Sequence, residues 1–127
     1  MLKINKLKEK LNNGEVVIGT WNTLASPLVT EVFAQAGLDF QIIDLEHGPF
    51  ILDQIHLHVS ACENSNNCTP LVRIPSKSDW MALQALDQGA HGLVAPHVDS
   101  AKSAQNFVNM SKYHPEGYRG FTPFSKA

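Results

Sequence analysis

The stretch FQIIDLEHGPF, residues 40–50, places a short apolar run directly before two carboxylates and an imidazole. The apolar run is typical of a buried strand, and the Gly-Pro pair that follows indicates a sharp turn. Charged groups at the end of a buried strand cost desolvation free energy unless they are paired or used in chemistry. Asp44, Glu46 and His47 are therefore the first candidates for a functional site.

Strands and helices are predicted to alternate on both sides of this stretch. A charged amphipathic helix over residues 2–12 comes first, and four strand–helix units follow it. The strands are predicted at 15–23, 39–47, 70–75 and 91–96, and the helices after them at 26–37, 50–62, 79–89 and 100–113. Short apolar strands without polar alternation are typical of a parallel sheet that is covered on both faces. The sequence therefore predicts an α/β fold with a parallel sheet.

Composition restricts the class of protein. The 127 residues are 43% hydrophobic and 17% charged, which fits a single domain over residues 1–127. The formal net charge of −2 and the lack of a basic run argue against nucleic-acid binding. No apolar stretch approaches the roughly 18 residues of a membrane span, and no apolar signal-peptide core opens the chain, so a cytoplasmic protein is expected.

The number of strands leaves two architectures open. Four parallel strands with helices on one side do not close, whereas a complete (β/α)₈ barrel takes roughly 250 residues. The chain supplies about half of that length and finishes in an irregular segment rich in Gly and Pro. The sequence thus predicts either an open four-unit sheet or the first half of a barrel.

Polar residues follow the predicted strands at their carboxyl ends, where α/β folds place their chemistry. Residues 20–23, Asp44 with His47, Arg73 and His97 all fall there. An imidazole is suited to act as a general base near neutral pH, Asp44 to hold its tautomer, and a guanidinium to bind a carboxylate or enolate oxygen. The simpler alternative is that Asp44 caps the following turn and Arg73 pairs with it.

Other ionisable residues carry weaker signals. His56 and His58 lie two positions apart on a predicted helix, so both are expected to be solvated. Asp87 stands near the end of a helix, where an acid is electrostatically unfavourable unless it has a use. Cys62 and Cys68 lack the spacing of a zinc site, and two free thiols are expected.

These pieces together resemble the HpcH/HpaI aldolase/citrate lyase family of metal-dependent pyruvate aldolases. The resemblance rests on D-x-EHGP at 44–49, VR-x-P at 72–75 and LD-x-G-x-x-G-x-x-x-P-x-V at 86–98, in that order. It implies the N-terminal half of a TIM (β/α)₈ barrel with a leading helix. It also implies reversible cleavage of a 4-hydroxy-2-oxo acid to pyruvate and an aldehyde, and assembly into a homo-oligomer.

The resemblance also assigns roles to single residues. His47 matches the acid/base group, and Arg73 matches the residue that binds the keto-acid and steadies the enolate. Asp44 is implied to support His47, and Asp87 to help position it, across a subunit boundary in some arrangements. A divalent Mg²⁺ or Mn²⁺ is implied as the Lewis acid.

The chain departs from the family pattern in one respect. The family takes its metal ligands from a Glu and an Asp on later strands, and the sequence ends before both, so no metal ligand is expected in this chain. The C-terminal half of the barrel is expected to be missing, and the 127 residues alone are expected to be inactive. Two alternatives stay open: a non-catalytic half barrel that assembles with itself or with a missing half, and a citrate-lyase-like acyl-CoA lyase.

Overall fold

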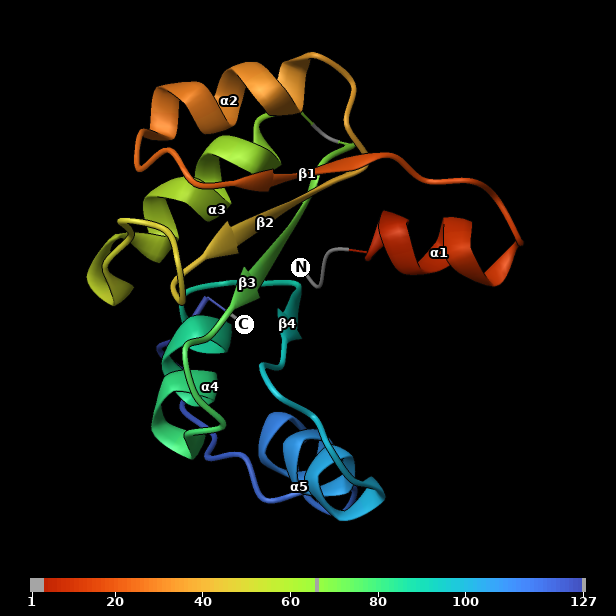
Figure 1. Cartoon of the computed structure of the whole chain (residues 1–127), viewed down its shortest axis with the longest axis vertical. Coiled ribbons are helices and arrows are strands. Elements are labelled where there is room, and N and C mark those ends of the chain that lie inside the picture. The colour runs from red at the N-terminus through yellow and green to blue at the C-terminus, as the bar shows by residue number, and fades with distance from the viewer. Residues whose placement is uncertain (1–3, 66, 127) are drawn as a thin grey trace.

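A computed structural model describes residues 4–65 and 67–126 of the chain. The helices and strands follow each other in the predicted order (Figure 1). The helices are α1 (Lys6–Asn12), α2 (Pro27–Gln35), the 3₁₀ helix η1 (Leu52–Gln54), α3 (Ile55–Glu63), α4 (Asp79–Asp87) and α5 (Ala101–Ser111). The strands are β1 (Gly19–Asn22), β2 (Phe40–Asp44), β3 (Thr69–Arg73) and β4 (Gly92–Val94). The predicted parallel α/β architecture is confirmed.

The four strands form one parallel sheet in the order β1-β2-β3-β4. Figure 1 shows α2, α3 and α4 along one side of this sheet and α1 beyond the ends where the strands begin. Three contacts hold α1 there: Asn5 Nδ2 donates to the His91 carbonyl at 3.2 Å, Lys6 Nζ donates to Asn67 Oδ1 at 3.1 Å, and Lys10 Nζ lies 2.5 Å from Asp39 Oδ1. Sequential parallel strands with helical crossovers are the arrangement of one half of a (β/α)₈ barrel.

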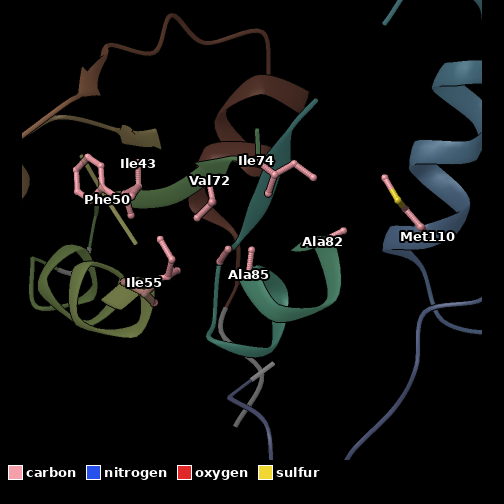
Figure 2. Packing of buried hydrophobic residues seen from close by; sticks show 10 residues of the cluster. Ile43, Phe50, Ile55, Val72, Ile74, Ala82, Ala85 and Met110 are labelled. Atoms are coloured by element: carbon pink, nitrogen blue, oxygen red, sulfur yellow. The ribbon is translucent and has the colours of Figure 1, made fainter. Parts of the chain in front are cut away.

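The hydrophobic core lies between the sheet and the helices that cover it. Ile43 and Val72 are register partners on neighbouring strands and both are fully buried. Figure 2 shows them beside Ile55 of α3 and Ala85 of α4. Because side chains alternate between the two faces of a strand, Ile43 and Val72 point toward the helices while their sequence neighbours point to the opposite face.

The strand β2 is shorter than the predicted span of 39–47, because Asp44 ends it. The Asp44 carboxylate accepts hydrogen bonds from the backbone N–H groups of Glu46 at 2.9 Å and His47 at 3.2 Å. The turn therefore begins at Leu45, three residues before the Gly48-Pro49 pair that indicated it. Gly48 donates its N–H to the Asp44 carbonyl at 3.0 Å, and a Cβ at this position would collide with that carbonyl oxygen.

A polar network is buried between β1, β2 and the helices α2 and α3. His58 Nδ1 lies 2.8 Å from Thr30 Oγ1, and Asn22 Nδ2 donates to that same hydroxyl at 2.9 Å. Gln41 Nε2 donates to the Thr30 carbonyl at 2.8 Å. The prediction that His58 is solvated is wrong, because its side chain faces the sheet and is fully buried, whereas His56 is exposed as predicted.

The two cysteines are free, as expected, and both are buried beside this network. Gln41 Nε2 lies 3.5 Å from the sulfur of Cys62 and 3.5 Å from that of Cys68. Across residues 4–65 and 67–126, every helix is too short or too polar to cross a lipid bilayer.

Candidate active site

The Asp44–Arg73 pair is the centre of the polar cluster at the carboxyl ends of the strands. The two residues are register partners at the ends of β2 and β3. Arg73 Nε donates to Asp44 Oδ1 at 2.8 Å and Nη2 donates to Oδ2 at 2.6 Å, which is the bidentate geometry of a strong charged pair. Asp44 is almost fully buried, so the guanidinium compensates a carboxylate that water does not reach.

The hydrogen bonds around Asp44 keep it ionised. Burial by itself would raise the pKa of Asp44, but donors from Arg73, Trp21 and the backbone amides of Glu46 and His47 hold that pKa well below its usual range. The hydrogen bond to Asp44 in turn raises the pKa of Arg73. The pair therefore stays charged across the physiological pH range.

Trp21 fixes this pair from the neighbouring strand β1. Its indole Nε1 donates to Asp44 Oδ2 at 2.9 Å, and the Arg73 guanidinium carbon lies 4.6 Å from the centroid of its ring. The ring thus supplies a donor to the carboxylate and a π face to the cation. No role was predicted for Trp21 from the sequence. The signal that could have identified Trp21 is its place in the sequence: an aromatic residue with an N–H donor, at a strand end where polar residues gather.

Glu46 connects Arg73 to the fourth strand. Its Oε2 lies 3.2 Å from Arg73 Nη1, and its Oε1 lies 3.4 Å from His97 Nε2. His97 follows β4, is 85% exposed at its side chain and has a φ of 48°, in the left-handed region that non-glycine residues rarely adopt. His97 therefore lies at the carboxyl ends of the strands, as predicted. Glu46 joins the cluster through Arg73.

His47 lies beside the cluster, with its imidazole free to meet a ligand. The residue is exposed, and the hydrogen bond that joins it to Asp44 comes from its backbone N–H. Within residues 4–65 and 67–126, the imidazole makes no hydrogen bond. Asp44 thus fixes the backbone at His47 and does not hold the ring tautomer, which corrects the expected mode of support. These contacts agree with the simpler alternative from the sequence, in which Asp44 caps the following turn and pairs with Arg73.

Asp87 lies elsewhere in the chain. It is the last residue of α4, and because α4 returns along the sheet, its end lies toward the ends where the strands begin. Asp87 Oδ1 accepts from Arg119 Nη2 at 2.6 Å, and its carbonyl accepts from the Lys126 N–H at 2.9 Å. A single copy of the chain therefore does not bring Asp87 to His47.

The donor count of Arg73 leaves room for a ligand. A guanidinium carries five N–H groups, of which that of Nε and one of Nη2 donate hydrogen bonds to Asp44. Nη1 forms an ion pair with Glu46 at 3.2 Å. Within residues 4–65 and 67–126, the second N–H of Nη2 and the N–H groups of Nη1 donate no hydrogen bond, so they can bind the oxygens of a small carboxylate.

The residues present do not fit a divalent metal ion. Among residues 4–65 and 67–126, no three His, Cys, Asp or Glu side chains converge in a way that could hold one. Asp44 and Glu46 are the carboxylates nearest the site, and both already bind Arg73. A metal such as Mg²⁺ prefers several oxygen ligands in near-octahedral geometry, which this cluster does not supply.

Four parallel strands covered by helices, with a charged cluster at their carboxyl ends, are the arrangement of one half of a TIM barrel. The profile of the HpcH/HpaI aldolase/citrate lyase family matches residues 17–125, and the chain belongs to this family of lyases.

Curated proteins and solved structures agree with this assignment. A hydroxypyruvate/pyruvate aldolase of Roseovarius nubinhibens is 38% identical over 116 residues, which cover 91% of this chain and 45% of that protein. A 4-hydroxy-2-oxovalerate aldolase of Novosphingobium aromaticivorans is 38% identical over 117 residues, covering 92% and 45%. The crystal structure of an HpcH/HpaI aldolase from Desulfitobacterium hafniense superposes with a TM-score of 0.84 at 38% identity, covering 91% and 45%. The chain spans about half the length of the curated relatives it matches.

Proposed function

We propose that this chain carries the acid/base and anion-binding half of an aldolase that reversibly cleaves a 4-hydroxy-2-oxo acid to pyruvate and an aldehyde. The observation that carries the proposal is the Arg73 guanidinium, held by Asp44 and Glu46 with N–H donors left over, next to the turn that carries the exposed His47. The named activities of the Roseovarius and Novosphingobium relatives support the same reaction class.

Retro-aldol cleavage needs a base at the 4-hydroxyl group and a clamp for the keto-acid. In the proposed mechanism, His47 removes the hydroxyl proton, the C3–C4 bond breaks, and its electron pair forms the enolate of pyruvate as the aldehyde leaves. The same imidazolium then returns a proton to C3 of the enolate. Arg73 binds the carboxylate or enolate oxygen, and Trp21 and Asp44 hold Arg73 in place.

Two further parts of the proposal lie outside the single chain. The family implies a divalent Mg²⁺ or Mn²⁺, whose ligands we place on residues other than those described. The resemblance assigns Asp87 to the positioning of His47. Because Asp87 pairs with Arg119 within one chain, we propose that any such contact forms between two subunits. Without a metal site of their own, the 127 residues alone are proposed to lack turnover.

The experiment that tests this proposal is a chimera. Residues 17–125 replace the matching segment of the Roseovarius aldolase, and pyruvate release from a 4-hydroxy-2-oxo acid is measured with added Mn²⁺ or Mg²⁺. We expect the chimera to release pyruvate and His47→Ala to lower kcat by roughly 10²–10⁴-fold. His56→Ala is the matched control. Like His47, His56 is an exposed histidine, but it lies at the start of α3 and not at the charged cluster.

Two results would contradict the proposed role. One is a folded, active chimera in which His47→Ala keeps full kcat. The other is metal-dependent pyruvate release by the unmodified 127-residue chain, which would mean that its own residues bind the metal.

A further inference from the structure

Cys62 and Cys68 meet in the buried layer between the sheet and the helices α2 and α3. Cys62 lies in the last turn of α3, and Cys68 directly precedes β3. The exposed fraction is 0% for Cys62 and 5% for Cys68. The two thiols are hydrogen-bonded to each other, and Ala34 of α2 completes the small cluster that they form. The chain thus holds two thiols in direct contact that the proposed aldolase chemistry does not use.

Gln41 on β2 donates to both sulfurs. Its Nε2 lies 3.5 Å from the Cys62 sulfur and 3.5 Å from the Cys68 sulfur. The same nitrogen donates to the Thr30 carbonyl at 2.8 Å. A side-chain amide nitrogen carries two hydrogens, so with one on Thr30 the other is shared between the two sulfurs. This donor stabilises negative charge on either sulfur.

Ser65 connects the backbones of the two cysteines. Its Oγ donates to the Cys62 carbonyl at 2.9 Å and accepts from the Cys68 N–H at 3.2 Å. A disulfide requires two Cα atoms within roughly 7 Å of each other, with side chains that face one another. The Ser65 bridge brings the backbones together, and the contact between the thiols supplies the facing side chains.

The hydrogen bond between the thiols gives the two sulfurs different roles. Donation from the Cys62 thiol lowers the pKa of Cys68, and Gln41 lowers it further, while burial acts in the opposite direction. The same hydrogen bond raises the pKa of Cys62. Cys68 is also the thiol that keeps some exposure. Cys68 is therefore suited to be the nucleophile, because the thiolate is the reactive form, and Cys62 keeps its proton for a second step.

The pair does not fit a metal ion. A structural zinc ion takes four ligands. Over residues 4–65 and 67–126, no three His, Cys, Asp or Glu side chains lie together in a group that could hold a metal. Two thiols in contact fit instead a reagent that removes two electrons from them, and a small neutral reagent fits a pair with so little exposure.

We propose that Cys62 and Cys68 form a redox-active dithiol, which hydrogen peroxide oxidises to a disulfide within the folded chain. The Cys68 thiolate attacks one peroxide oxygen and the O–O bond breaks, which leaves a sulfenic acid on Cys68 and a hydroxide ion. The Cys62 sulfur then attacks the sulfenic sulfur, the S–O bond breaks, and the Cys62 proton leaves with that oxygen as water. The proton that Cys68 had lost converts the hydroxide to a second water.

The balance of the two steps is closed. Each sulfur loses one electron, the two peroxide oxygens are reduced to two molecules of water, and one S–S bond is formed. The inference concerns a site at the start of β3, away from Arg73 at its end, and does not depend on the proposed aldolase reaction.

The first measurement is the intact mass of the chain after treatment with hydrogen peroxide under native conditions, with remaining thiols alkylated after unfolding. We expect a single chain that is lighter by two hydrogen atoms, takes up no alkylating reagent and regains both thiols with dithiothreitol. Peptide mapping is expected to find Cys62 joined to Cys68. Two fully alkylated thiols, a disulfide between chains, or sulfinic and sulfonic acids without a cross-link would each overturn the proposal.

The rate of oxidation in increasing urea distinguishes reaction of the folded chain from reaction of the unfolded chain. The free energy of unfolding falls linearly with urea, so the unfolded fraction rises exponentially. We expect the rate to change by less than about twofold below the unfolding transition, because the folded chain or a small local opening reacts. A rate that rises in proportion to the unfolded fraction would overturn the proposal.

Two matched variants then assign the two roles. Cys62→Ser is expected to stop at the sulfenic acid of Cys68, which dimedone traps as an adduct. Cys68→Ser is expected to react with peroxide at least about tenfold more slowly, because Cys62 lies deeper and keeps its proton. Both variants are expected to retain the circular dichroism spectrum of the unmodified chain. Equal rates in the two variants would overturn the assignment of Cys68 as the nucleophile.

Discussion

Arg73 binds Asp44 through two hydrogen bonds, Nε to Oδ1 at 2.8 Å and Nη2 to Oδ2 at 2.6 Å. These two hydrogen bonds join the end of β3 to the end of β2. The Asp44 carboxylate that accepts them is almost fully buried. The same carboxylate caps the turn that carries His47. One residue thus orients the candidate anion-binding group and the backbone of the candidate acid/base group.

Loss of the guanidinium is expected to destabilise the fold. Arg73→Met leaves a buried carboxylate without its partner, and we expect the free energy of unfolding in urea to fall by about 3–5 kcal/mol. The double variant Arg73→Met with Asp44→Asn leaves no buried charge, so it is expected to be more stable than Arg73→Met alone by about 1–3 kcal/mol. Equal stability of Arg73→Met and the unmodified chain would show that the pair is not formed in solution.

The indole N–H of Trp21 is expected to stabilise the same pair. Trp21→Phe keeps an aromatic face for Arg73 but removes the donor to Asp44 Oδ2, so the free energy of unfolding is expected to fall by about 1.5–3 kcal/mol. Trp80→Phe is the matched control, because Trp80 is exposed on α4 and is expected to change stability by less than about 0.5 kcal/mol. Similar losses in both variants would argue against a specific role for the indole N–H.

The stability of the chain is expected to fall below neutral pH because of His58. Burial lowers the pKa of His58 from its ordinary value of 6.5, so the unfolded chain takes up the proton more readily than the folded chain. The contribution is complete above pH 6.5 and is lost as pH falls from 6.5 toward the lower folded pKa. The expected slope is at most about 1.4 kcal/mol per pH unit.

Urea unfolding at a series of pH values measures this slope, and two variants identify its source. His58→Gln is expected to remove the decline, whereas His56→Gln, at an exposed position of the same helix, is expected to keep it. A decline that persists unchanged in His58→Gln would assign it to other groups.

Asp87 and Arg119 offer a test of the role that the family resemblance gives to Asp87. Asp87→Asn and Arg119→Gln break the same ion pair from its two sides, so both are expected to lower the melting temperature of the chimera. If Asp87 positions His47 across a subunit boundary, Asp87→Asn lowers kcat as well and shifts its pH profile. Arg119→Gln is expected to keep both. Equal kcat in the two variants would leave Asp87 with a structural role.

The alternation of strands and helices was readable from the sequence because each element carries a local signal. Ser26-Pro27 opens α2 with a side-chain cap and a fixed φ, and Gly37 ends the segment with a positive φ. The element boundaries were less readable. β2 ends three residues early because the Asp44 side chain captures backbone amides, which is a competition between side chain and sheet that no periodicity reveals.

By itself, the sequence determined the parallel α/β order, the family and the position of His47, Arg73 and Asp44 at neighbouring strand ends, because these depend on short motifs and on the polarity of parallel strands. Only the tertiary structure decided that Trp21 and Glu46 complete the cluster, that His58 is buried, and that Asp87 lies with Arg119 away from His47. These outcomes depend on the register between strands and on which face of a helix meets the sheet. Such contacts join residues far apart in the chain, and local patterns carry no record of them.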